Sequence, residues 1–233
     1  MVLMTHMSAT MKVCKRSTTA WLMDLNYLEN IIEDCGTNMF MFDIETLGVE
    51  STTVILSAGI IHFDPEKDAD ITYDQLVARG MFVKFNAKDQ VKRLDRTMTK
   101  STLDWWGKQG EWQQKTSFVP NAEEDLLAED GIRVLKKYVN KYNTDGEDKV
   151  IMWARGSLDQ MAFDSLCNKA GVEPLVNFSR WRDVRTAVDM LTGSTNGYCK
   201  VDGLDWDVVA KHHPVHDCAL DILMLVRGIS EES

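Results

Sequence analysis

Two carboxylates separated by one residue are the first feature of this chain that could support catalysis. Asp43 and Glu45 lie at the end of a short apolar run, residues 39–44, which predicts a buried strand. Side chains alternate along a strand, so both acids project from one face. Carboxylates this close repel each other unless a cation neutralises them, and Mg²⁺ prefers oxygen ligands. The pair indicates a metal site, although D-x-E also occurs by chance at solvated strand ends.

A third acid follows a second apolar run. Residues 150–154 predict a buried strand, and Asp159 lies after a turn of small residues, where a helix over residues 159–170 is expected to begin. Aspartate is also a favoured N-cap residue, and that role needs no catalysis. Asp164 is a rival candidate five residues further on, at a mid-helix position that favours a solvent-facing side chain.

A histidine and an aspartate five residues apart lie near the end of the chain. We expect a strongly apolar helix over residues 217–227, with Asp217 as its N-cap and His216 just before it. Asp221 interrupts the apolar residues of this helix, and a carboxylate in such surroundings needs a partner or a metal. A histidine whose ordinary pKa is near ~6.5 is suited to accept a proton from water.

Taken together, the four acids predict a site for two divalent cations. Asp43, Glu45, Asp159 and Asp221 could hold two ions ~3.5–4 Å apart, one activating water and the other stabilising a leaving oxygen. His216 would take the proton from that water. A zinc site built from the histidines around residue 213 and Cys218 is disfavoured, because no second ligand pair follows at zinc-finger spacing.

The elements that must position these residues predict a mixed α/β sheet. Strands are expected over residues 39–44, 52–63, 81–85, 150–154 and 179–182, and helices over residues 100–108, 122–142, 159–170, 184–191 and 217–227. Short connections between the first three strands indicate an antiparallel meander. The later strand–helix alternation then predicts a mixed sheet with helices on both faces.

Composition limits the class of protein. The length of 233 residues suits one substantial domain. A net charge of −10 argues against a passive nucleic-acid coat, which should be basic, but not against a nuclease, whose carboxylates bind cations. With no apolar run of membrane-spanning length and no signal peptide, we expect a cytoplasmic protein without a membrane partner. Five cysteines lacking a C-x-x-C pair are expected to be reduced thiols.

The chain divides into two parts. Residues 1–37 are an N-terminal extension with an expected amphipathic helix over residues 18–34, and its function is not readable. Residues 38–233 are expected to form the catalytic domain.

The order of these motifs resembles a known family. D-x-E on a first strand, a later aspartate and H-x4-D are similar to the DEDDh branch of the DnaQ-like (DEDD) exonucleases, which share an RNase H-like fold. The stretches F-D-I-E-T-L-G, K-S-T-L-D-W-W, W-A-R-G-S-L-D and V-H-D-C-A-L-D-I-L-M resemble the phage exonuclease A (DexA) family over about residues 39–224. Enzymes of the RNase T and exonuclease VIII type are less similar. The turn before Asp159 is one residue shorter than in the family, which keeps Asp164 open.

The resemblance implies an RNase H-like fold with a five-stranded mixed sheet, and it implies nuclease activity. A metal-dependent 3′→5′ exonuclease would act on the 3′ end of single-stranded DNA and release 5′-mononucleotides. Its cofactors would be two Mg²⁺ or Mn²⁺ ions held by Asp43, Glu45, Asp159 and Asp221, with His216 as general base. The same chemistry on RNA and a non-catalytic binding module remain alternatives. A phage-encoded enzyme would work in the host cytoplasm, and exonucleases of this type often form homodimers.

The resemblance and the residue types also suggest substrate contacts. Leu47 and Gly48 would lie against the terminal nucleotide, where a small residue permits close approach. Trp105 or Trp106 could stack on bases, or both could be core residues. Phosphates could be held by arginines, namely Arg155, Arg182 and Arg185. Surface salt bridges are the alternative for these arginines, and Arg155 is favoured because it lies beside the turn before Asp159.

Overall fold

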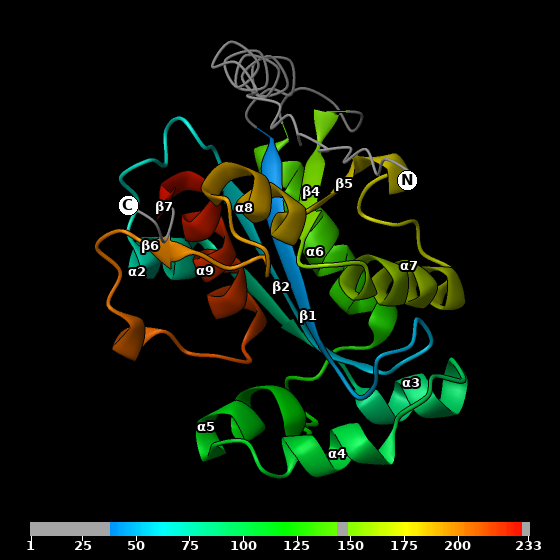
Figure 1. Ribbon diagram of the computed structural model, residues 1–233. Helices are drawn as coiled ribbons and strands as arrows, with labels where there is room; N and C mark the ends of the chain where they lie inside the picture. The colour runs from blue at the N-terminus through cyan, green and yellow to red at the C-terminus, as the bar shows by residue number, and fades with distance from the viewer. Residues whose placement is uncertain (1–37, 144–148, 230–233) are drawn as a thin grey trace, which may run out of the picture. The chain divides into compact units, whose positions relative to one another are not determined.

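The computed structural model describes residues 38–143 and 149–229 (Figure 1). The expected N-terminal extension with its amphipathic helix lies outside the described residues. Within the described ranges, no helix combines the length and apolar character that a bilayer crossing requires. Cys167 and Cys218 are buried free thiols, and Cys199 is buried as well.

A mixed five-stranded sheet forms the centre of the domain, as expected. Its strands are β1 (Met39–Thr46), β2 (Ile55–Phe63), β3 (Met81–Lys84), β4 (Ile151–Ala154) and β5 (Trp181–Asp183), in the order β3-β2-β1-β4-β5. β1, β2 and β3 pair antiparallel, whereas β4 and β5 run parallel to β1. The antiparallel meander and the mixed five-stranded sheet are therefore confirmed. β6 (Lys200–Val201) and β7 (Gly228–Ile229) form a separate small sheet.

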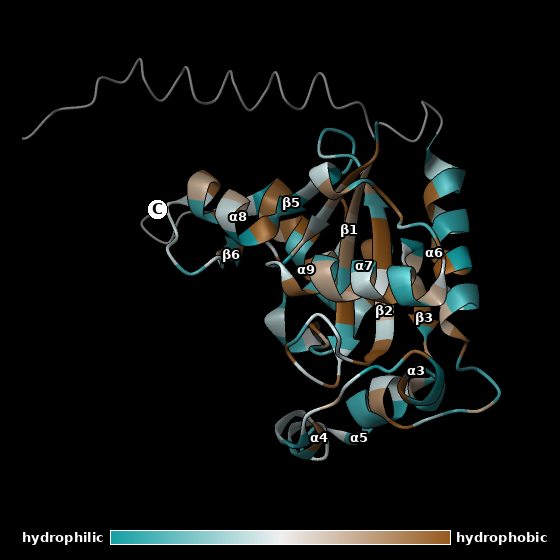
Figure 2. Ribbon diagram, turned by 90° about the vertical axis from the view of Figure 1, so that its right-hand side faces the viewer, coloured by the Kyte–Doolittle hydropathy of each residue, from teal (hydrophilic) through white to brown (hydrophobic). Residues whose placement is uncertain are grey.

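Helices cover both faces of the main sheet (Figure 1). They are α2 (Tyr73–Arg79), α3 (Ala87–Arg93), α4 (Lys100–Trp106), α5 (Glu111–Gln113), α6 (Ala128–Tyr142), α7 (Leu158–Ala170), α8 (Val184–Thr192) and α9 (Pro214–Arg227). α6 and α7 pack on one face, where Phe42 of β1 contacts Phe163 edge to face with 4.9 Å between ring centroids. α9 packs against β1 and β2. Figure 2 shows the hydrophobic strands β1 and β2 between these layers.

A close approach between β2 and α9 sets the spacing of the second layer. Gly59 of β2 pairs with Asp43 of β1. A Cβ atom at Gly59 would lie 2.5 Å from the backbone of both Pro214 and Val215, so only glycine leaves room for the start of α9. The Cys218 thiol also contacts the Gly59 carbonyl oxygen at 3.6 Å. This contact brings the first turn of α9 directly over the acidic face of β1.

Two helices begin at other residues than expected. α9 begins at Pro214 rather than Asp217, with His213 as its N-cap. Proline lacks an N–H group and favours the first helical position, so it starts the helix instead of preceding it. α6 begins at Ala128 rather than residue 122, because Leu126 donates its N–H to the carbonyl of Lys84 and continues the sheet as an isolated bridge.

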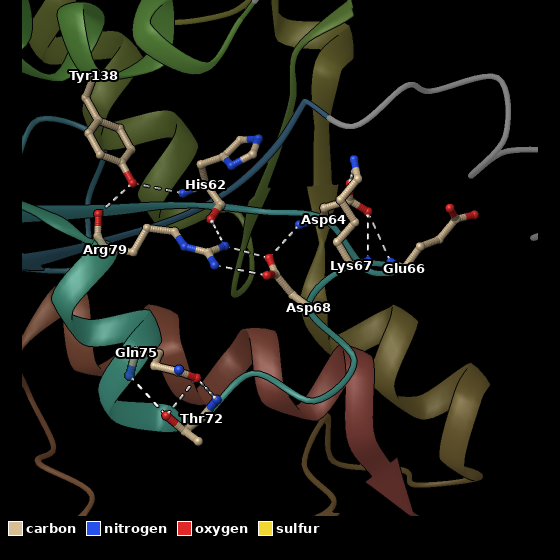
Figure 3. Close-up of polar contacts among 9 residues, drawn as sticks. All are labelled: His62, Asp64, Glu66, Lys67, Asp68, Thr72, Gln75, Arg79 and Tyr138. Carbon is tan, nitrogen blue, oxygen red and sulfur yellow. Dashed lines mark hydrogen bonds and ion pairs between the residues drawn. The ribbon is translucent and has the colours of Figure 1, made fainter.

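Short elements that the sequence analysis did not predict complete the domain. α2 begins with a capping box in which Thr72 and Gln75 exchange side-chain and backbone hydrogen bonds. A polar network holds the loop before it (Figure 3). In this network Arg79 binds both carboxylate oxygens of Asp68, at 2.6 and 3.0 Å, and Tyr138 links the Arg79 carbonyl to the His62 N–H. The network fixes α2, which carries a residue of the candidate site.

Candidate active site

The end of β1 carries the first two acids on the face that α9 covers. Phe42 and Ile44 turn toward the core under α6 and α7, so Asp43 and Glu45 share the opposite face, as expected. A register shift between Glu45 and Thr46 ends the regular pairing with β2. The acids therefore lie where the central strand leaves the sheet.

Asp159 reaches the same place from the neighbouring strand. Pairing between β1 and β4 ends at Met41 and Trp153, so β1 extends beyond its parallel neighbour. The chain then turns into α7, and Asp159 accepts the buried N–H of Ile44 at 3.3 Å. Asp159 is thus buried beside the β1 acids, whereas Asp164 lies one and a half turns further along α7.

The tightest acidic group contains a residue that the sequence analysis assigned to capping. Asp43, Glu45 and Asp217 each offer a carboxylate oxygen, and these oxygens lie within 4.8 Å of one another. Asp217 lies inside the first turns of α9 instead of at the N-cap, and it accepts the N–H of His213 at 3.1 Å. The sequence did hold a signal for it: Asp217 and Asp221 are four apart, so they share one helical face.

Crowding of these carboxylates makes their ionisation unfavourable. Burial, followed by repulsion from Asp159, Asp217, Glu45 and Asp221, raises the pKa of Asp43 well above its usual range. Burial likewise raises the pKa of Asp159 to about 7 and that of Asp217 to about 7, with repulsion from Asp221 adding to both. Asp43 is therefore the electrostatic centre of five acids.

Asp221 differs from the other acids because it has a cationic partner. Arg155, in the turn after β4, contacts both oxygens of Asp221, with its Nη2 at 2.6 Å and its Nε at 3.0 Å from Oδ1. A third donor of the same guanidinium binds the Gly197 carbonyl at 2.6 Å, and Tyr198 lies against the guanidinium face. Arg155, expected to contact substrate phosphate, instead holds Asp221 in this structure.

His216 is held by a tyrosine from α2. The Tyr73 hydroxyl lies 2.7 Å from His216 Nδ1 and also accepts the N–H of Ala210. Burial lowers the pKa of His216, so the imidazole is neutral near pH 7. Trp112 lies edge to face with His216, 5.7 Å between ring centroids, and is 46% exposed. The sequence analysis assigned no role to Tyr73 or Trp112: Tyr73 lies in the stretch T-Y-D-Q-L-V-A-R-G, which also resembles the phage family, but nothing in that stretch indicates its contact with His216.

The two adjacent tryptophans have different surroundings. Trp106 is fully buried, packs with Leu47 and donates its indole N–H to the Thr46 carbonyl at 3.0 Å. It is a core residue, which corrects the expectation that it might stack on bases. Trp105 is 39% exposed and lies edge to face with His212.

Leu47 and Gly48 continue directly from the acidic end of β1. Leu47 is buried, and its backbone groups bond to Val54 and Thr99. A Cβ at Gly48 would lie 2.8 Å from the Thr53 hydroxyl, so packing within the protein already requires glycine there.

The donor set fits hard divalent cations. Clustered carboxylate oxygens are the ligands that Mg²⁺ and Mn²⁺ prefer. Burial, with repulsion between the carboxylates adding to it, raises the pKa values of Asp43, Asp159 and Asp217, and a bound cation would favour their charged forms. Among the described residues, Arg155 is the cation paired with this group, and it pairs with Asp221 alone.

Comparisons with known proteins identify the family of the chain. A family model described as the 3′-5′ exoribonuclease Rv2179c-like domain matches residues 38–227. The protein named exodeoxyribonuclease of Enterobacteria phage T4 is 32% identical over 206 residues, which cover 80% of this chain and 86% of the phage protein. Among solved structures, S. pombe Pop2p in its Mg²⁺- and Mn²⁺-bound form aligns with a TM-score of 0.49 and 13% identity, over 89% of this chain and 88% of that chain.

A structure of the RNase domain of yeast Pop2 aligns less well, with a TM-score of 0.40 and 10% identity over 89% of this chain and 81% of that chain. Both structures resemble the chain too distantly to inform its chemistry. The family model, in contrast, spans nearly all of the described residues. The chain therefore belongs to the family of Rv2179c-like 3′-5′ exoribonuclease domains and is a 3′→5′ exonuclease.

Proposed function

We propose that the enzyme removes 5′-mononucleotides from the 3′ end of single-stranded DNA, using two Mg²⁺ or Mn²⁺ ions. The observation that carries this proposal is the crowding of five acids around Asp43 beside a neutral histidine. Asp43, Glu45, Asp159 and Asp221 are the proposed cation ligands, and Asp217 joins them because of its place in the tightest group. When bound, such ions lower the pKa of water and offset charge on the leaving oxygen.

His216 is the proposed general base. In this role Nδ1 carries the ring proton and donates it to the Tyr73 oxygen 2.7 Å away, so that Nε2 has the lone pair that accepts the proton of the attacking water. Because burial lowers the pKa of His216, the ring is in the unprotonated form that this step requires near pH 7. Tyr73 keeps the ring from rotating away, and it contacts the base rather than the substrate.

The proposed substrate contacts follow from the surroundings of the acids. Leu47 and Gly48, which continue directly from the acidic end of β1, are the proposed floor for the terminal nucleotide. Trp105, with its partly exposed ring, is available for stacking, which is worth ~1–3 kcal/mol per base. Arg155 acts on substrate indirectly in this proposal, by holding Asp221.

DNA is favoured over RNA by the phage relative, whose name is exodeoxyribonuclease and whose identity of 32% extends over most of both chains. The description of the family model contains the word exoribonuclease, which makes RNA the second candidate substrate. The two polymers differ by the 2′-OH group. Digestion of DNA and RNA oligomers of one sequence, side by side, decides between them.

The primary test uses single-stranded DNA labelled at either end, with Mg²⁺ or with EDTA. We expect Mg²⁺-dependent release of the 3′ label as mononucleotide and a ladder that shortens toward the 5′ label. Asp43→Asn should lower the rate by roughly three orders of magnitude, whereas Asp164→Asn, which lies on α7 beyond Asp159, should not. Full turnover by Asp43→Asn would contradict the site assignment. Light scattering of the purified protein checks the homodimer that the resemblance implies.

A further inference from the structure

A cavity of about 440 Å³ lies beside the acidic cluster. Its lining includes Gly156 and Ser157, which immediately precede the helix that carries Asp159, and the stretch Trp181–Asp183 of β5 together with Arg185. The volume falls within the range of small-molecule sites, ~300–1,000 Å³, and therefore exceeds what a single inorganic ion needs. The cavity borders the turn before Asp159. A nucleic-acid strand whose 3′ end lies at the acids would therefore pass the opening of the cavity.

The charged lining of this cavity is positive overall. Arg182 and Arg185 supply two positive charges and Asp183 one negative charge, which leaves a balance of +1 among these three side chains. The Asp183 carboxylate is already occupied, since it accepts hydrogen bonds from the Gly156 N–H at 3.0 Å and the Thr186 hydroxyl at 2.6 Å. The negative charge is therefore partly screened within the protein, and the positive charges are left to attract an anion.

Of the three arginines near the site, Arg185 is the one with an uncommitted guanidinium. Arg155 is bound to Asp221 and to the Gly197 carbonyl. Arg182 donates to the carbonyls of Ser179 and Trp181. Arg185 is exposed, and within residues 38–143 and 149–229 its guanidinium makes no hydrogen bond or ion pair. Nothing in the described part of the chain therefore competes with a ligand for it.

The position of Arg185 is nevertheless fixed. Gly197 adopts a left-handed backbone, φ 74°, and a Cβ atom there would lie 2.6 Å from both Cβ and Cγ of Arg185. The loop thus packs against the stem of Arg185 while its carbonyl binds Arg155. Arg185 also lies close enough to the acids to act on them. Burial raises the pKa of Asp159 and Asp221, and attraction to Arg185 opposes that rise in both.

We propose that this cavity binds the phosphodiester group on the 5′ side of the scissile one, with Arg185 as the residue that contacts it. The proposal rests on the proposed function, because the scissile phosphodiester itself would lie at the acids. Guanidinium groups match phosphate oxygens with paired N–H donors. Trp181 supplies an apolar wall for the nucleotide that carries this phosphate.

The substrate offers an internal control for the test. A dinucleotide without a 5′ phosphate has only the scissile linkage, whereas a trinucleotide also has the next one. We expect Arg185→Ala to lower kcat/KM on the trinucleotide by roughly ten- to a hundredfold and to leave the dinucleotide within about twofold. Arg185→Lys should recover part of the loss, since lysine keeps the positive charge but lacks the paired N–H donors of a guanidinium group. Equal losses on both substrates, or no loss, would overturn the proposal.

A binding measurement separates this proposal from the proposed function. Anisotropy of a labelled single strand in EDTA reports binding without any hydrolysis. We expect Arg185→Ala to weaken binding and to reduce the salt slope by about one unit, and replacing the phosphodiester next to the terminal one by a neutral methylphosphonate should abolish that difference. Arg133→Ala, which removes one positive charge from α6, is the matched control and should change little. If no nucleic acid is hydrolysed, the proposed function fails, but these binding differences still test Arg185.

Discussion

Arg155 holds Asp221 by both carboxylate oxygens, in a pair whose side chains are 12% and 9% exposed. Asp221 belongs to the acidic set expected to bind cations. The Arg155 guanidinium therefore binds carboxylate oxygens that are also expected to bind metal ions. Burial raises the pKa of Asp221, and Arg155 counteracts part of that rise. Arg155 is therefore the counter-charge of Asp221 in this structure.

Arg155→Ala should lower the free energy of unfolding measured in EDTA by about 3 kcal/mol, because Asp221 would stay buried without a partner. The same variant should bind Mg²⁺ more tightly, since a positive charge has been removed from the site. Excess Mg²⁺ should consequently reduce the difference in unfolding free energy between Arg155→Ala and the unmodified protein. Urea unfolding with and without Mg²⁺ measures both effects, and Arg155→Lys is the control that keeps the charge. Unchanged stability in EDTA would show that the pair is dispensable.

Asp217→Asn should weaken cation binding roughly tenfold or more, because Asp217 shares the tightest carboxylate group with Asp43 and Glu45. Calorimetric titration with Mn²⁺ measures this directly. Asp164→Asn serves as the matched control on α7 and should bind Mn²⁺ like the unmodified protein. If Asp217→Asn binds Mn²⁺ like the unmodified protein, Asp217 has only the capping role suggested by its hydrogen bond from the His213 N–H.

The ion-free protein should lose stability as the pH rises. Asp159 and Asp217 have pKa values raised to about 7, above the value near 4 of an unfolded chain. Between those values the folded state binds more protons than the unfolded state, so stability falls with rising pH across this window. Cation binding requires the charged carboxylates and should strengthen over the same window. Melting temperatures from pH 5 to pH 8, in EDTA and in Mg²⁺, should diverge; parallel curves would contradict this account.

Tyr73→Phe removes the hydroxyl that lies 2.7 Å from His216 Nδ1. We expect kcat to fall by about tenfold or more while KM changes little, because the base loses its orientation and the substrate loses no contact. The acidic limb of the pH–rate profile should also move, since the hydrogen bond influences the pKa of the imidazole. A loss of stability with an unchanged profile would indicate a merely structural role for Tyr73.

Gly59→Ala should destabilise the domain by about 1–3 kcal/mol and reduce activity further than the stability loss explains. The new Cβ would lie 2.5 Å from the backbone of Pro214 and Val215. α9 would have to move away from β1 and take Asp217 with it. Gly107→Ala is the control, because its Cβ would meet only ordinary contacts at 3.6 Å and beyond. Cation affinity and urea unfolding, measured together, separate displacement of the site from simple loss of fold.

Local patterns in the sequence were sufficient to predict most of the sheet. Apolar runs gave four of the strands to within a few residues, and alternation along β1 placed Asp43 and Glu45 on one face. Gly171, in a left-handed conformation, ends α7 as expected. β5 is the exception, because the expected strand over residues 179–182 divides into a 3₁₀ turn followed by Trp181–Asp183.

Features that depend on contacts between distant segments could not be predicted in this way. The pairing of Tyr73 with His216 joins residues 143 positions apart, and that of Arg155 with Asp221 joins residues 66 apart. The hydrophobic periodicity of the sequence indicates helices and strands, but it does not indicate which residues so far apart in the sequence come into contact. Asp217 was assigned to capping because the expected start of α9 was three residues late, and Trp106 could not be told from Trp105 until one of them was seen to be buried.

The dependence of the acidic cluster on α9 also affects when the nuclease can become active during its synthesis. All five strands of the main sheet, and both acids of β1, emerge from the ribosome before Pro214 does. Domains fold as units while the chain is made from its N-terminal side. Until α9 docks over Gly59, the nascent chain lacks Asp217, Asp221 and His216. A chain whose synthesis has not passed α9 therefore lacks the proposed base and two of the proposed cation ligands, and we expect it to leave nucleic acid intact.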